Sequence, residues 1–199
     1  GMPAWVTAGT GMDAFSHCLE AYCAPGFHPM ADGIALEGMR LVAGALVRAV
    51  LHPEDLDARA DMLVAASMGA TAFQKGLGGM HALAHPIGAL YDTHHGMTNA
   101  TLMPYVLKFN RELIEERITR LAAYLKLANP GFDSFLELVM QLRSETGVPH
   151  SLTELGVDEQ QTALIAEMAI VDPSASGNPR PLNAADTAQL FTDAVRGEL

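Results

Sequence analysis

The chain has 199 residues, of which 49% are hydrophobic, enough to bury the core of one domain and to exclude global disorder. Its 12 basic and 23 acidic residues give a net charge of −11 and form no basic cluster, which argues against nucleic acid or an anionic membrane surface as a partner. Aromatic residues are only 6%, so the composition favours packed helices over sheets.

The first half of the chain predicts three helices, at about 7–22, 30–51 and 53–74. Thr7 or Thr10 would cap the first helix, and Pro53 would stand at the first position of the third. Because residues 62–74 carry no charge, we expect the third helix to be the buried centre of the domain.

The second half predicts helices at about 80–91, 96–109, 111–127, 132–146, 158–171 and 183–196. Pro86 and Pro104 lie inside two of them and predict kinks. Asn110 is expected to separate two helices, and residues 172–181 to form a loop. No segment alternates with period two for long enough to be a strand. The predicted fold class is therefore an all-α bundle of eight or nine helices.

Cysteine content and hydropathy favour a cytoplasmic protein. Cys18 and Cys23 would point to different faces of one helix, so we expect no disulfide. We recognise no signal peptide and no membrane span. Gly1 before Met2 resembles the remnant of a tag, so the helical domain is expected to span residues 2–199.

Histidines are concentrated in residues 76–99, GLGGMHALAHPIGALYDTHHGMTN, which contain four of the eight in the chain. His81 and His85 are four residues apart and share a face of a helix. A single histidine on an apolar helix is more often a hydrogen-bonded core residue than a ligand. The segment alone therefore leaves both interpretations open.

A second pair with the same spacing, Asp13 and His17, strengthens the interpretation as a metal site. His95 follows His81 by 14 residues, just after a predicted turn, and could fold back to the same place. Imidazoles suit Fe, Zn, Ni or Cu, and one carboxylate offsets the charge of the ion. A coordination position left open would let the ion act as a Lewis acid.

Three long strings resemble the iron-containing (group III) alcohol dehydrogenases: TAGTGMDAFSHCLEAY, GFHPMADGIALEG and HALAHPIGALYDTHHGMTNATLMPYVLKFN. The resemblance covers nearly the whole chain, but only the helical, metal-binding C-terminal half of that family, a dehydroquinate synthase-like α domain. It implies that Asp13, His17, His81 and His95 are the metal ligands. It places His85 beside the metal, near substrate and nicotinamide, as a catalytic residue that does not ligate.

The resemblance implies hydride transfer between a small-molecule alcohol, or its aldehyde or ketone, and NAD(P). Fe(II) is the expected metal, with Zn or Ni as alternatives in a purified sample. Other readings are a catalytically silent metal-binding fragment, or a domain of a maleylacetate reductase-like or hydroxyacid–oxoacid transhydrogenase relative. An oxygenase-like or hydrolytic metal site would use the same ligand chemistry without nicotinamide.

The family's N-terminal α/β dinucleotide-binding domain is expected to be absent from this chain. Gly76, Gly78 and Gly79 follow a predicted helix rather than a strand, so they do not form a dinucleotide-binding turn. No residue here is assigned to the dinucleotide. We expect an exposed, partly apolar cleft at the metal residues, covered either in a homodimer or by a separate dinucleotide-binding domain.

Overall fold

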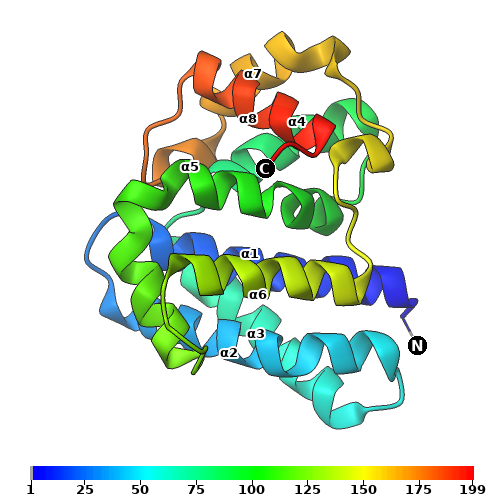
Figure 1. The fold of residues 1–199 in the computed structure, drawn as a ribbon, viewed down its shortest axis with the longest axis vertical. Helices are drawn as coiled ribbons and strands as arrows, with labels where there is room; N and C mark the ends of the chain where they lie inside the picture. The colour runs from blue at the N-terminus through cyan, green and yellow to red at the C-terminus, as the bar shows by residue number, and fades with distance from the viewer. Residues whose placement is uncertain (1) are drawn as a thin grey trace.

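The computed structural model describes residues 2–199, and within this range all regular elements are helical (Figure 1), which confirms the predicted fold class. The α-helices are α1 (Ala4–Cys23), α2 (Pro29–Leu51), α3 (Leu56–Ala72), α4 (Gly79–Tyr91), α5 (His95–Tyr124), α6 (Phe132–Thr146), α7 (Thr162–Ile170) and α8 (Ala184–Arg196). The 3-10 segments are η1 (Phe73–Lys75), η2 (Leu152–Leu155), η3 (Glu159–Gln161) and η4 (Pro173–Gly177). None of the described helices is long and apolar enough to cross a membrane.

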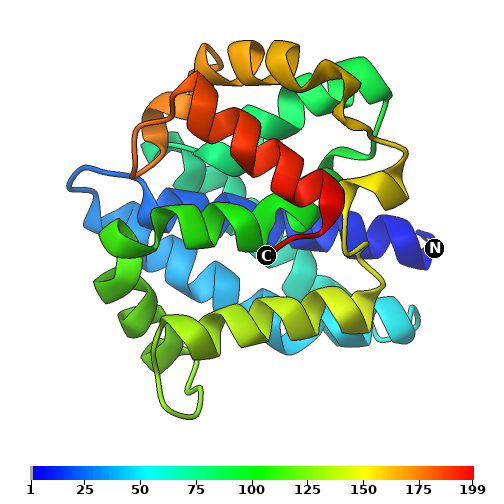
Figure 2. The ribbon, with the colours of Figure 1, turned by 45° about the horizontal axis from the view of Figure 1, so that its top comes forward.

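Helix α1 is the central element of the domain. It packs against α2 and α3 on one side and α5 on the other, and it crosses the middle of the molecule in Figures 1 and 2. Met12, Phe15 and Leu19 are almost fully buried. Its centre therefore holds side chains in fixed positions between the two layers.

The start of α1 differs from the prediction, because neither threonine caps it. The helix begins at Ala4, with Pro3 at the N-cap. The hydroxyls of Thr7 and Thr10 instead donate to the carbonyls of Pro3 and Val6, one turn earlier. A threonine can satisfy its hydroxyl inside a helix in this way, so its presence alone does not mark a helix start.

Helix α3 also differs from the prediction, in its start and in its burial. It begins at Leu56, and the Asp55 side chain caps it by accepting from the Ala58 N–H (2.9 Å), so Pro53 lies outside the helix. It is not the buried centre of the domain. Leu63 and Val64 are 71% and 51% exposed.

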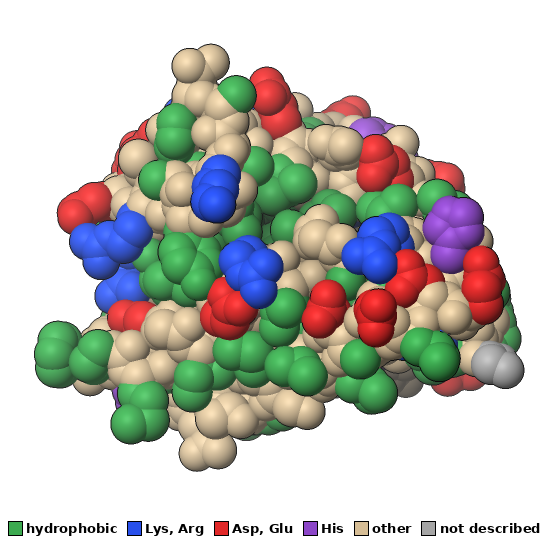
Figure 3. Space-filling model, turned by 90° about the horizontal axis from the view of Figure 1, so that it is seen from below, with side chains coloured by type: hydrophobic (Ala, Val, Ile, Leu, Met, Phe, Trp, Pro, Cys, Tyr) green, Lys and Arg blue, Asp and Glu red, His purple; other side chains and the backbone are tan. Residues whose placement is uncertain are grey.

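Small residues explain why α3 lies at the surface. Ala58, Ala65, Gly69 and Ala72 form its buried side, where they allow close packing on α1 and α2. The absence of charge reflects an apolar outer surface rather than burial. The view from below, toward the end at which α2 and α3 are labelled in Figure 1, shows hydrophobic side chains spread among charged ones (Figure 3).

Helix α5 is continuous where two helices are predicted, although it changes direction along its length (Figures 1 and 2). Asn110 is inside it and its side chain is not a cap. The amides of Asn110 and Asn178 exchange two hydrogen bonds of 2.9 Å. Asn110, which the sequence predicted to end a helix, thus forms a tertiary contact that holds the segment after η4 against α5.

The beginning of α5 lies unusually close to α1. A Cβ atom built on Gly96 would overlap the Gly9 carbonyl oxygen and lie 3.1 Å from the Asp13 Cβ. Only glycine at this position allows the two backbones to approach this far. The close crossing places His95, the first residue of α5, beside Asp13.

Candidate metal centre

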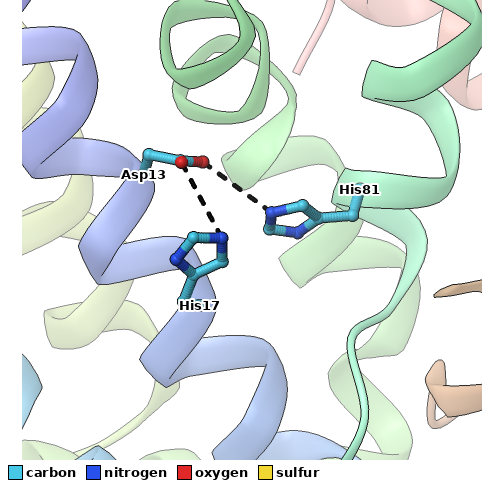
Figure 4. A group of neighbouring side chains, drawn as sticks. All are labelled: Asp13, His17 and His81. Carbon is cyan, nitrogen blue, oxygen red and sulfur yellow. Dashed lines mark ion pairs between the residues drawn. The ribbon is translucent and has the colours of Figure 1, made fainter. Parts of the chain in front are cut away.

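Three side chains from α1 and α4 form a compact donor cluster (Figure 4). One donor atom each from Asp13, His17 and His81 lies within 4.8 Å of the other two. Asp13 Oδ2 is 3.7 Å from His17 Nε2, and its Oδ1 is 3.7 Å from His81 Nε2. The two imidazole rings are stacked with centroids 4.9 Å apart.

His95 approaches the same carboxylate from α5. Its Nε2 is 3.6 Å from Asp13 Oδ1, and its ring centroid is 5.2 Å from that of His81. The buried Asn99 links the two residues, since its Nδ2 donates to Asp13 Oδ1 (2.9 Å) and lies 3.0 Å from His95 Nε2. Helices α1, α4 and α5 therefore bring one carboxylate and three imidazoles to one place.

Local features of each helix place the candidate ligands. Asp13 and His17 are one turn apart on α1, so their side chains project together. His81 is in the first turn of α4, which begins at Gly79 with Gly78 at the N-cap. His95 is in the first turn of α5, where His94 caps the helix by accepting from the Met97 N–H (3.3 Å).

The exposure of the cluster changes from one side to the other. The His81 side chain is 2% exposed, Asp13 and His17 are about one-fifth exposed, and His95 is 42% exposed. The site therefore has a closed floor at α4 and an open side at α5. A small molecule could reach an ion held at the centre through this open side.

Burial and neighbouring charges set the protonation of the imidazoles. Burial lowers the pKa of His17 and of His95, against the opposing effect of the Asp13 carboxylate. Burial also acts to lower the pKa of His81, but the Glu20 and Asp13 carboxylates outweigh it, and the pKa is raised. Lowered values at His17 and His95 favour the neutral ring, which is the form that ligates metals.

The residues fit a divalent ion in donor type, spacing and solvation. Metal bonds of about 2.0–2.2 Å place neighbouring donor atoms roughly 3–4 Å apart, and the three imidazole nitrogens are 3.6–3.7 Å from the Asp13 oxygens. His81 Nε2 is buried and has no hydrogen-bond partner among residues 2–199. A buried acceptor without a partner is costly in free energy, and a metal ion would remove that penalty.

His85 lies beside the cluster on the exposed side and is paired with an aspartate. Its ring stacks on His95 with centroids 5.5 Å apart and planes 10° apart. Its Nδ1 is 2.8 Å from Oδ2 of Asp172, the residue that caps η4. This partner was not predictable from the sequence, because Asp172 is 87 residues away and lies in a predicted loop.

The other four histidines have local partners. His28 caps α2 by accepting from the Ala31 N–H, and His94 packs edge-on against Trp5. His52 is near Glu54, and His150 Nε2 is 3.1 Å from the Gly197 carbonyl oxygen. All four lie outside the donor cluster.

Comparison with known proteins places the chain in one sequence family. The model for the Fe-containing alcohol dehydrogenase family, C-terminal, matches residues 7–195. The chain is 39% identical to 4-hydroxybutyrate dehydrogenase of Cupriavidus necator, with 98% of the chain and 53% of that protein covered. It is 36% identical to 1,3-propanediol dehydrogenase of Citrobacter freundii, with 98% and 52% covered.

The fold has the same relatives. The crystal structure of a 1,3-propanediol oxidoreductase superposes with a TM-score of 0.92 at 36% identity, over 96% of this chain and 52% of that one. The chain thus spans about half the length of the relatives it matches. The residues that the family model matches include Asp13, His17, His81 and His95.

Proposed function

The chain belongs to the iron-containing alcohol dehydrogenase family, and on that premise we propose that it is the metal-binding catalytic part of an NAD(P)-dependent dehydrogenase. The substrates would be small alcohols and the corresponding aldehydes or ketones, as the names of the relatives suggest. The resemblance implies that the part of the relatives outside the match binds the dinucleotide. Fe(II) is the metal we expect, with Zn(II) or Ni(II) as alternatives because nitrogen-rich sites bind them tightly.

The observation that supports this proposal is the donor cluster itself. With His95 added, it contains three imidazoles from three helices, each with a ring nitrogen 3.6–3.7 Å from an oxygen of Asp13. We propose all four as ligands, with His95 the most exposed of them. A bound divalent ion would supply Lewis acidity to the oxygen of the alcohol or carbonyl compound.

His85 is proposed as the residue that exchanges a proton with the substrate side of the site. Asp172 occupies its Nδ1, so Nε2 is the ring atom left to take up or release a proton. The same contact holds the ring parallel to His95. Asp172 therefore has the part of a positioning residue for His85.

Two apolar side chains flank the open side. Trp5 is 57% exposed beside the cap of α5, and Val171 is 77% exposed next to Asp172. We propose that a dinucleotide-binding domain covers this face, which would exclude water from hydride transfer. A homodimer through the same face is the alternative.

Metal binding is tested on the chain alone. Chain stripped with a chelator is reconstituted anaerobically with Fe(II), Zn(II) or Ni(II), and the retained metal is measured by elemental analysis. We expect stoichiometric metal in the wild type and its loss in His81→Ala. The variant His52→Ala is the matched control, because His52 is an exposed imidazole at the end of α2, near Glu54 and outside the cluster. A wild type that retains none of the three metals would refute the ligand assignment.

Turnover distinguishes an enzyme from a silent metal-binding fragment. Oxidation of 1,3-propanediol and 4-hydroxybutyrate is followed with NAD⁺ and NADP⁺ for the chain and for a fusion. The fusion places the unmatched half of the Cupriavidus necator relative before the chain. We expect metal-dependent turnover in the fusion that is lost in His81→Ala. Metal binding without turnover in the fusion would favour the silent fragment, and turnover without nicotinamide would favour an oxygenase or hydrolase.

A further inference from the structure

A buried carboxylate lies directly behind the donor cluster. Glu20 is on α1 two turns after Asp13, and its side chain is 4% exposed. Its Oε2 is 2.6 Å from His81 Nδ1 and accepts from the Gly78 N–H (2.8 Å), while its Oε1 accepts from the Met80 N–H (2.7 Å). The family resemblance assigned no role to this residue.

These contacts determine which nitrogen of His81 faces the cluster. An ionised carboxylate only accepts hydrogen bonds, so the proton between the two groups is on Nδ1 of the neutral ring. Nε2 then carries the lone pair. It is the buried nitrogen that has no partner among residues 2–199 and that lies 3.7 Å from Asp13 Oδ1.

We propose that Glu20 is a positioning residue that fixes His81 as the Nδ1–H tautomer and directs its Nε2 lone pair at the metal. The proposal rests on the metal site proposed above. Carboxylates that accept from the second ring nitrogen orient ligating histidines and raise their basicity, and their removal typically weakens metal binding about 10–100-fold. Here Glu20 is on the same helix as two of the four proposed ligands. Helix α1 therefore carries Asp13 and His17 and also the carboxylate that orients His81.

Glu20 also satisfies two backbone N–H groups at the start of α4, so its role as a helix cap must be separated from its role at His81. Asn178 offers the separation. Its Oδ1 accepts from the Gly79 N–H (3.0 Å) at the same helix end, and within residues 2–199 it forms no hydrogen bond to His81. The variant Asn178→Ala therefore removes a cap from α4, together with the paired amides of Asn110 and Asn178, and leaves the contact between Glu20 and His81 in place.

The first test needs no variant. Long-range ¹H–¹⁵N spectra of the metal-free wild type, recorded at a pH where the imidazoles are neutral, report the tautomer of each histidine. We expect His81 to carry its proton on Nδ1. A proton on Nε2 of His81 would overturn the proposal, and this readout does not depend on metal binding.

The second test measures Zn(II) affinity by competition with a chromophoric chelator for wild type, Glu20→Met, Glu20→Gln and Asn178→Ala. Met removes both carboxylate oxygens, so we expect a loss toward the upper end of about 10–100-fold. A Gln oxygen replaces only one carboxylate oxygen, so we expect a smaller loss. Asn178→Ala should lower stability and keep the wild-type affinity.

The outcomes separate the two proposals. If the wild type binds no Zn(II), the metal site fails, and the tautomer of His81 still decides the role of Glu20. If the wild type binds Zn(II) and both Glu20 variants bind it equally well, only the positioning role fails. If Glu20→Met does not fold, Glu20→Gln and the wild-type spectra remain decisive. Equal weakening in Asn178→Ala and the Glu20 variants would reduce Glu20 to a helix cap.

Discussion

The close crossing of α1 and α5 should depend on a single hydrogen atom, the side chain of Gly96. In Gly96→Ala the new Cβ would lie 2.7 Å from the Gly9 carbonyl carbon and would overlap the carbonyl oxygen. Carbon atoms in contact are about 3.5–4.0 Å apart, so the helices must separate by roughly 1 Å. Both partners are backbone atoms of helices, so no flexible side chain can move away.

Inserting a methyl group into such a packed contact typically costs about 1–3 kcal/mol. The better helix propensity of alanine offsets part of this, by at most about 1 kcal/mol. We expect a net destabilisation of about 1–2 kcal/mol, or a Tm lower by roughly 2–8 °C for a chain of this length. The separation would also move His95 away from Asp13, whose Cβ is 3.1 Å from the new atom.

The assay combines urea unfolding followed by circular dichroism with Zn(II) competition. Gly44→Ala is the matched control, because Gly44 is inside α2 and a Cβ there meets nothing within 4 Å. The control should stabilise the chain by up to about 1 kcal/mol and leave metal affinity unchanged. If Gly96→Ala is as stable as Gly44→Ala, and binds Zn(II) as tightly, the contact does not control the geometry of the cluster.

Further expectations concern one ligand, the thiols and an exposed ion pair. Asp13→Asn should weaken Zn(II) binding in the competition assay, and unchanged affinity would remove the carboxylate from the ligand set. Burial raises the pKa of Cys18 and Cys23 to about 12, so neither should react with a disulfide reagent at pH 8 until the chain is unfolded; rapid reaction of the folded chain would contradict this. Hydrogen bonds from Arg40 and a tyrosine hydroxyl lower the pKa of Glu37 from 4.5 to about 2. The contribution of Glu37 to stability is therefore complete above pH 4.5 and is lost as the pH falls toward 2. A carboxyl ¹³C titration of Glu37 with a midpoint near pH 4.5 would refute the lowered pKa.

Helix positions and helix faces were predictable because they depend on local periodicity. The spacing of Asp13 and His17 indicates one face of a helix, and the structure has it on α1. The 132–146 helix agrees at both ends, where a glycine and a left-handed Gly147 mark its limits. Local rules act within a few residues, so one sequence is enough to apply them.

Burial and distant partners were not predictable in the same way. The uncharged part of α3 indicates a core helix by composition, but small residues turn only one side inward. Asn110 has the character of a cap, and only the position of Asn178, 68 residues later, shows why it is inside a helix. The roles of Asp172 and Glu20 likewise depend on contacts with histidines on another helix, His85 and His81. Such pairings depend on the packing of whole helices.

The paired amides of Asn110 and Asn178 have a consequence for how this domain can vary. They anchor one end of the segment that begins at Asp172, and the other end is held by His85. A segment held at both ends must have a fixed number of residues, so an insertion or deletion between 172 and 178 would break one of the two contacts. The number of residues between 172 and 178 is therefore constrained, and so is Gly177, where a Cβ atom would overlap the Leu77 carbonyl oxygen.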